Sequence, residues 1–247
     1  MILRIPLVFL LFLFAGHSYS QDRQNFAAPN YELIEKATKD KTSNSYYPKL
    51  LQRFKQNDTT LTAREVHLLY YGRFFQDGMA NPFGGASQHI DSIRAINAKQ
   101  EQTDNDRRQL MSYYLDDLEQ EPFALNTLYA LYATSTMLHD PTRIYYDKKL
   151  EMLVGTILAT GDGKTAKSGW HVGSVADEYA ILGVLGLKSV SQSLRGHCDY
   201  MALQENERGL TGVYFDIAKI LEAEMKMFQP AATDEVTPQE KPGKKKK

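Results

Sequence analysis

Apolar residues recur every three or four positions from about residue 30 to residue 158, which predicts a series of amphipathic helices. The clearest stripe contains Leu110, Tyr114 and Leu118. Thr62 and Glu65 have the spacing of a capping box, which predicts a helix start at that point. Further stripes begin near Tyr31, Leu50, Ile90 and Tyr146, and Pro122 fits the first turn of a helix that carries Leu125 and Leu128 on one face. Short helices joined by short turns favour antiparallel helical hairpins, loosely similar to tetratricopeptide arrays. The spacing of the tyrosine pairs does not establish a true repeat.

The period changes after Leu158. Residues 168–174 read as a strand, and residues 176–185 as a helix that ends near Gly186. Residues 200–203 and 210–217 alternate between apolar and polar side chains, and a polar, glycine-containing stretch between them predicts a hairpin connection. A last helix carries Leu221, Met225 and Phe228. The predicted fold is therefore α+β and mostly helical, with a small, partly antiparallel sheet packed beside the helical hairpins.

Both ends of the chain differ from this pattern. Arg4 precedes an apolar run of residues 5–15, and Ser18 and Ser20 fit a cleavage site before Gln21. This pattern is typical of a secretory signal peptide and is too short for a membrane span. Residues 229–247 lack apolar periodicity and end in KKKK, so we expect a disordered tail. We expect one domain over residues 21–228, with a helical part (30–158), a sheet-containing part (159–228) and one shared core. The signal peptide predicts export to the periplasm or the extracellular space.

Composition excludes several classes of protein. The formal net charge is −1, and no basic face is evident in the body of the chain, which argues against nucleic-acid binding. After signal cleavage, no segment is apolar enough to span a bilayer. Cys198 is the only cysteine, so no intramolecular disulfide can form, and a lone cysteine is more often a small buried side chain than a nucleophile.

Three stretches resemble a known family. They read LLYYGRFFQDGMANPF, VADEYAILGVLGL and YMALQENERGLTGVYFDI. Together they are similar to a domain-of-unknown-function family of secreted proteins from Bacteroides-type Gram-negative bacteria, over about residues 31–219. The resemblance implies an uncharacterised periplasmic or extracellular protein and carries no catalytic residues with it.

The stretch GDGKT at residues 161–165 is similar to the end of a phosphate-binding loop. The full motif requires a glycine at position 158, where this chain has Leu158, and it requires a helix after the loop instead of a strand. We therefore interpret GDGKT as a helix stop followed by a turn, and we expect no nucleotide or other cofactor. In the next helix, Ser174 is the predicted N-cap, with Asp177 as its partner in a capping box.

Candidate catalytic residues are few. His171, Glu178 and His197 are the best candidates for a dispersed hydrolase site, but no activated nucleophile accompanies them. His197 and Cys198 are adjacent, so on a strand their side chains should point to opposite faces. No histidine pair has the spacing of a zinc motif, and a zinc site would have to be assembled from distant positions. The sequence therefore predicts no metal site.

Binding through aromatic side chains is the remaining possibility for the function. The chain has 15 Tyr and 11 Phe residues, many of them in adjacent pairs. The loop around residues 78–85 presents Met79, Asn81 and Phe83 among glycines and a proline, and it is a possible binding loop. We interpret the protein as a non-enzymatic binding or interaction module of the bacterial envelope, with a peptide, a glycan or another envelope protein as its partner. The alternative is a hydrolase with a site near His171, Glu178 and His197.

Overall fold

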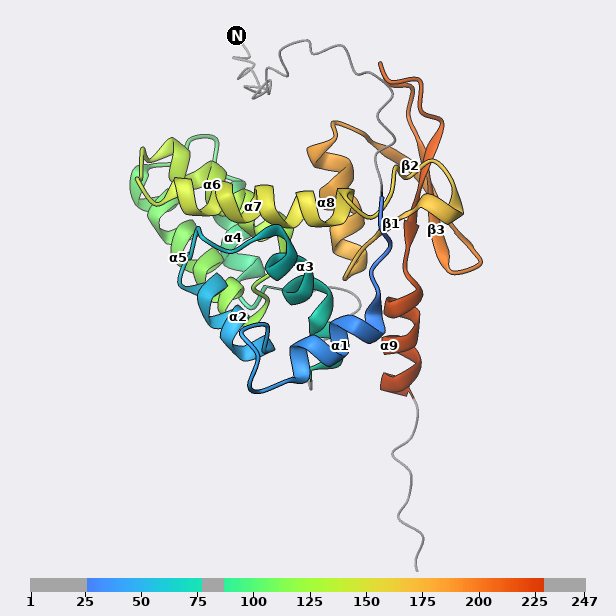
Figure 1. Cartoon of the computed structure of the whole chain (residues 1–247). Coiled ribbons are helices and arrows are strands. Elements are labelled where there is room, and N and C mark those ends of the chain that lie inside the picture. The colour runs from blue at the N-terminus through green and yellow to red at the C-terminus, as the bar shows by residue number, and fades with distance from the viewer. Residues whose placement is uncertain (1–25, 77–86, 229–247) are drawn as a thin grey trace, which may run out of the picture.

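The computed structural model describes residues 26–76 and 87–228. Within these ranges, helices come first along the chain and most of the strands follow them (Figure 1). The helical part consists of α1 (Tyr31–Lys39), α2 (Tyr47–Lys55), α3 (Ala63–Gly72), the 3-10 helix η1 (Arg73–Phe75), α4 (Ile90–Asn97), α5 (Asp104–Gln120), α6 (Leu125–Met137) and α7 (Arg143–Leu158). The rest consists of η2 (Ala166–Ser168), β1 (Trp170–His171), α8 (Val175–Val184), β2 (Ser189–Arg195), β3 (Cys198–Leu203), β4 (Gly212–Asp216) and α9 (Ala218–Phe228).

The helix starts follow the local rules seen in the sequence. Thr62 and Glu65 form the predicted capping box at the start of α3, and Thr103 and Asp106 form a second one at the start of α5. Each box satisfies backbone N–H groups that have no partner within the first turn. These caps, together with short connections, produce the predicted stack of helices, in which α5, α6 and α7 pack as successive neighbours.

The strands form one mixed sheet in the order β1-β4-β3-β2. β1 runs parallel to β4, whereas β3 is antiparallel to both β4 and β2. The sheet lies on the right in Figure 1, with α8 beside it and α9 continuing from the end of β4. The predicted hairpin connection between β3 and β4 is confirmed, with Gly209 at a φ of 65°. The mostly helical α+β class predicted from the sequence is also confirmed.

Several elements differ from the prediction. The strand predicted over residues 168–174 is only Trp170–His171, because Ser174 already caps α8 and the N–H of Gly173 donates to Tyr70. The helix expected to begin at Pro122 begins at Leu125 instead. β2 was missed altogether. Its side chains are largely exposed on both faces, so the burial that produces apolar alternation in a strand is absent.

Helices and sheet share one large hydrophobic cluster. Its buried members include Leu50 and Phe54 from α2, Ile157 from α7, and Met201 and Phe215 from the sheet. A smaller cluster lies among α4, α5, α6 and α7. Within the described ranges, no helix combines the length and the apolar character needed to cross a bilayer.

Candidate functional site

Three neighbouring strands bring His171, Asp216 and Cys198 into one row. The sheet register pairs His171 of β1 with Asp216 of β4, and it pairs Asp216 with Cys198 of β3. Residues that are paired across neighbouring strands present their side chains on the same face of a sheet. The row lies at the end of the sheet where β4 leads into α9.

His197 joins this row from the turn between β2 and β3. The turn consists of Gly196 and His197, and Gly196 has a φ of 67°, a conformation that favours glycine. The backbone N–H of Ile217 donates to the carbonyl of His197 at 3.0 Å, which attaches the turn to the end of β4. As a result, His197 Nε2 lies 3.2 Å from Asp216 Oδ2. We call His171, His197, Cys198 and Asp216 the sheet-end cluster.

His171 contacts the other oxygen of the same carboxylate. Its Nδ1 lies 3.6 Å from Asp216 Oδ1 and 3.5 Å from the hydroxyl of Tyr31. Burial lowers the pKa of His171, although the nearby Asp216 carboxylate acts in the opposite direction. The side chains of His171 and Asp216 are 13% and 12% exposed, whereas that of His197 is 60% exposed. The cluster therefore has a buried side at His171 and an open side at His197.

Cys198 lies at the buried centre of the cluster. Its Sγ is 3.5 Å from the carbonyl oxygen of Ala166, to which the thiol donates. Burial, followed by the carboxylates of Asp216 and Asp199, raises the pKa of Cys198 to about 11. The side chain is therefore a protonated thiol at neutral pH, which is a poor nucleophile. The expectation that His197 and Cys198 point to opposite faces was wrong. His197 is in a turn and not on a strand, and its ring nitrogen and Sγ lie within 4.8 Å of each other and of an Asp216 oxygen.

Glu178 lies apart from the sheet-end cluster. It is in the first turn of α8, and Gln192 Nε2 lies 3.4 Å from its Oε2 and 2.5 Å from Asp199 Oδ2. Asp199 follows Cys198 on β3, so its side chain is on the opposite face of the sheet. Burial, followed by the carboxylate of Asp199, raises the pKa of Glu178 to about 9. Of the three candidate catalytic residues, the structure brings His171 and His197 together and separates Glu178 from them.

Asp177, the neighbour of Glu178, has a different environment. Ser174 caps α8 as predicted, accepting from the N–H of Asp177 at 3.3 Å. The Asp177 carboxylate does not complete the predicted capping box. Instead it accepts from the hydroxyl of Tyr70 at 2.7 Å and from Arg73 Nη2 at 3.2 Å. Arg73 also lies 3.4 Å from Glu121 and stacks over the ring of Tyr70. The acidic pair of α8 is therefore used inside the protein.

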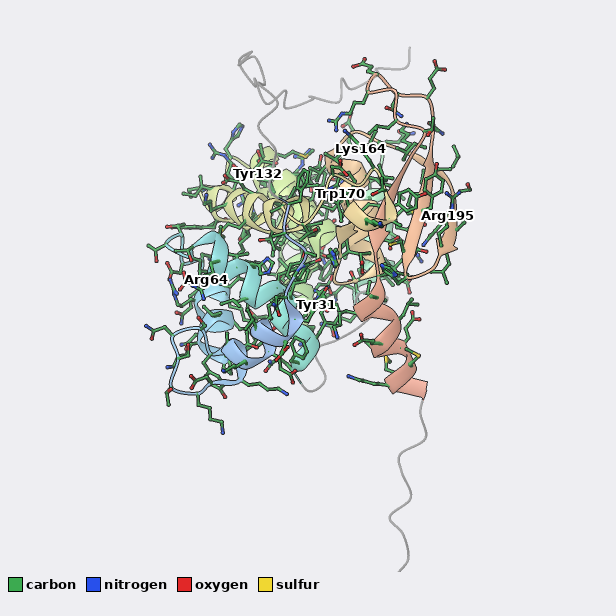
Figure 2. All side chains as sticks on the ribbon, turned by 45° about the vertical axis from the view of Figure 1, so that its right-hand side comes forward. Tyr31, Arg64, Tyr132, Lys164, Trp170 and Arg195 are labelled. Carbon is green, nitrogen blue, oxygen red and sulfur yellow. The ribbon has the colours of Figure 1, made fainter. Side chains whose placement is uncertain are left out.

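The GDGKT stretch forms a turn around Trp170. Asp162 accepts from the N–H of Lys164 at 3.0 Å and from the hydroxyl of Ser168 at 2.6 Å. Trp170 Nε1 donates to the carbonyl of Gly161, and the ring packs against Gly163, which has a φ of 69°. The side chain of Lys164 is 67% exposed. Figure 2 shows Lys164 and Trp170 near each other in this region. The predicted helix stop and turn are confirmed.

A shallow pocket of about 80 Å³ lies among α2, α5, α6 and α7, away from the sheet-end cluster. Its lining includes Phe54, Leu115, Leu128, Tyr146 and Lys149. Burial lowers the pKa of Lys149 to about 8. The possible binding loop with Met79, Asn81 and Phe83 lies outside the described residues.

Sequence reasoning missed Asp216, which is the residue that both histidines contact. The stretch Leu210–Ile217 was correctly predicted as a strand, but its register against two other strands is a property of the fold. A hint was present in the position of Asp216 at the end of an alternating strand, after the inward-facing Val213 and Phe215. Polar residues at such strand ends commonly approach residues of neighbouring strands and turns.

No curated protein and no solved structure matches the chain. A family model described as a domain of unknown function (DUF4919) matches residues 32–226. That range covers α1 through most of α9, and thus both the helical part and the sheet-end cluster. The protein belongs to this family, the domain of unknown function DUF4919.

Proposed function

We propose that the protein is an exported binding protein that captures an extended peptide segment of another envelope protein along strand β2. The single observation that carries the proposal is the position of β2. It is the last strand in the order β1-β4-β3-β2, and it pairs only with β3. Alternate residues of such an edge strand direct their N–H and C=O groups away from the sheet, where an added strand can bond to them.

The side chains of β2 support recognition of apolar residues on one face. Leu194 is 59% exposed, and Val190, which is 60% exposed, lies at the register shift between Ser189 and Ser191. Gln192 lies between them in sequence and accepts a 2.8 Å hydrogen bond from the hydroxyl of Tyr179 on α8. Tyr179 is itself half exposed. An added strand would place alternate apolar side chains against Leu194 and Tyr179.

The opposite face of β2 favours an acidic residue in the partner. Arg195 stacks on the ring of Tyr200 at 3.7 Å and donates to the hydroxyl of Tyr214 at 3.0 Å. No carboxylate of the described residues lies within ion-pair distance of Arg195. Figure 2 shows Arg195 on the outer side of the sheet, away from the helical part. A guanidinium that is held in place but lacks a counter-ion favours a carboxylate in the partner.

The alternative proposal, a hydrolase that uses His171, Glu178 and His197, has less support. Glu178 is on the other face of the sheet from the two histidines, and Cys198 is a buried, protonated thiol. Asp177 is paired with Arg73. A hydrolase that uses a side-chain nucleophile needs that nucleophile and a base within hydrogen-bond reach of each other, and none of these described groups forms such a pair.

Peptide binding can be tested with a phage-displayed library of random nine-residue peptides, selected on the chain beginning at Gln21. We expect enriched peptides with alternating apolar residues and an acid. Leu194→Lys should weaken the enriched peptides at least tenfold in calorimetry, because it places a charge on the apolar face of the added strand. Met137→Lys on α6 is the matched control, since Met137 is also apolar and 61% exposed. It should leave binding unchanged.

Hydrogen exchange distinguishes strand addition from other modes of binding. The bound peptide should slow exchange of amides in β2 and leave those of α6 unaffected. Equal binding to wild type and Leu194→Lys, or protection confined to another element, would refute the proposal. Self-association through two β2 edges would instead appear as a dimer in analytical ultracentrifugation without peptide.

Export is part of the same proposal and is supported by the signal-peptide pattern of residues 1–20. We expect cleavage after Ser20. Intact-mass measurement of the protein recovered from its native source should give a chain that begins at Gln21. A chain that retains Met1 would count against export by this route.

A further inference from the structure

We propose that the sheet-end cluster is a zinc site in which His197, Cys198 and Asp216 bind the metal. One ligand atom from each of these residues lies within 4.8 Å of the other two. Together they offer an imidazole nitrogen, a sulfur and a carboxylate oxygen, a combination that zinc accepts and that magnesium and calcium do not. The proposal is independent of peptide binding at β2.

The fold constructs this ligand set from three separate features. The register of β3 and β4 places Cys198 beside Asp216, and Gly196 permits the tight turn that returns His197 over the same face. The hydrogen bond from Ile217 to the His197 carbonyl fixes the backbone of that turn against β4. Two of the three ligands are thus on adjacent paired strands, where their positions are set by the sheet.

The three ligand atoms need to move only slightly closer together to bind a zinc ion. Zinc bonds of roughly 2.0–2.3 Å in a tetrahedral arrangement place ligand atoms about 3.5 Å apart. His197 Nε2 is already 3.2 Å from Asp216 Oδ2. The His197 side chain is 60% exposed and belongs to a turn, so it can rotate toward Cys198 without disturbing the core. Its exposure also provides the route by which an ion reaches the buried sulfur.

His171 acts as a positioning residue in this site. Its Nδ1 lies 3.6 Å from Asp216 Oδ1, the oxygen that His197 does not contact. Tyr31 lies 3.5 Å from the same ring nitrogen. At this distance the imidazole is within ion-pair range of the carboxylate, and residues that contact a metal ligand in this way help to orient it. In the bound state Cys198 gives its thiol proton to solvent, and the sulfur binds as the thiolate. The fourth position remains for water or for a ligand from outside the chain.

The site can be tested with metal added to the metal-free chain beginning at Gln21. Calorimetric titration should show a single Zn²⁺ bound per chain, together with a rise in melting temperature. With Co²⁺ as the probe, the protein should develop a thiolate-to-metal charge-transfer absorption, which reports the Cys198 sulfur directly. Cys198→Ser should abolish this absorption, and Asp216→Asn and His197→Ala should each weaken binding at least tenfold.

A second histidine–aspartate pair in the protein provides the matched control. His89 Nε2 lies 3.2 Å from Asp116 Oδ2, the same separation as in the sheet-end cluster, but in a different part of the fold. His89→Ala should leave metal binding and the Co²⁺ spectrum unchanged. His171→Ala should weaken binding less than His197→Ala does and should retain the charge-transfer absorption, as expected for a positioning residue.

Melting curves of each variant without metal will show whether it is folded before its binding is compared. His197→Ala changes an exposed residue and keeps the experiment decisive if Cys198→Ser does not fold. Failure of wild type to bind Zn²⁺ at tens of micromolar, binding that survives His197→Ala, or a Co²⁺ complex without the thiolate absorption would each overturn the proposal. Loss of peptide binding at β2 has no bearing on these outcomes.

Discussion

Two buried polar clusters lie on either side of the start of α8. Each surrounds a buried carboxyl group, but the neighbouring residues differ. Asp177 and Glu178 are consecutive residues, and they are 2% and 0% exposed. Asp177 points toward the helical part, where Arg73 and Tyr70 donate to its carboxylate. Glu178 points toward the sheet, where it meets the like-charged Asp199.

Asp177 and Glu178 are both buried, but a guanidinium lies beside Asp177 and a second carboxyl group lies beside Glu178. A nearby opposite charge favours the ionised form of a buried carboxyl group, whereas burial and a nearby like charge favour the protonated form. Burial, followed by the charge of Asp199, therefore raises the pKa of Glu178 to about 9. The neighbouring residue therefore distinguishes the electrostatic environment of Asp177 from that of Glu178. Three sets of variants test this difference.

Removal of the cation should have the largest effect. Arg73 is 3% exposed and lies between Asp177 and Glu121. Arg73→Met retains much of the volume but leaves the Asp177 carboxylate buried without its cation. Removal of one partner from a buried ion pair typically costs about 3–5 kcal/mol. We expect a loss of that size in the free energy of unfolding, measured by denaturant titration.

Arg64→Met is the control for Arg73→Met, because Arg64 is an exposed arginine of α3, the helix that directly precedes η1 (labelled in Figure 2). It should change stability by less than about 0.5 kcal/mol. The double variant Arg73→Met/Asp177→Asn should lose less than the sum of the two single losses, because the uncompensated charge is gone. Fully additive losses would show that Arg73 and Asp177 do not stabilise each other.

The raised pKa of Glu178 predicts that the stability of the protein depends on pH. Between the ordinary pKa of a glutamate, near 4.5, and the folded-state pKa of about 9, the folded protein retains a proton that the unfolded chain releases. Stability should therefore fall as pH rises from about 5 to 9, by at most about 1.4 kcal/mol per pH unit. Glu178→Gln cannot lose this proton, so its stability should fall less steeply over the same range.

Unfolding measured at several pH values for wild type and Glu178→Gln isolates this contribution from that of the histidines. Asp199→Asn should also reduce the slope, because it removes the neighbouring negative charge that raises the pKa of Glu178. If the two proteins have parallel stability curves between pH 5 and pH 9, Glu178 ionises in the folded state as readily as in the unfolded chain.

The helix cap should have the smallest measurable effect. Ser174 accepts from the N–H of Asp177, and loss of an N-cap side chain typically costs about 0.5–2 kcal/mol. Ser174→Ala should therefore destabilise the protein by about 1 kcal/mol in thermal or denaturant unfolding. Lys164→Ala is the control. Its side chain is 67% exposed, and we expect no more than a few tenths of a kcal/mol. A larger loss for Lys164→Ala than for Ser174→Ala would contradict the assignment of GDGKT as a solvated turn.

Much of the fold could be predicted because its signals are local. The caps at Thr62 and Ser174 and the hairpin at Gly209 each depend on residues within a few positions of one another. β2 could not be predicted, because a strand that is exposed on both faces has no buried side to pattern its sequence. The candidate site was predicted in part. His171 and His197 were singled out, but Asp216, which brings them together, was not.

The sequence by itself determined most of the helices, the caps at Thr62 and Ser174, the turn around Gly163 and the class of fold, since these result largely from hydrogen bonds and apolar periodicity within short segments. Only the tertiary structure decided the partners of the charged groups. Tyr70 and Asp177 are 107 residues apart in the chain, and His171 and Asp216 meet through the register of two parallel strands. Such contacts depend on how whole elements pack and align. For this reason neither the contacts of Asp177 and Glu178 nor the sheet-end cluster could be predicted from the sequence.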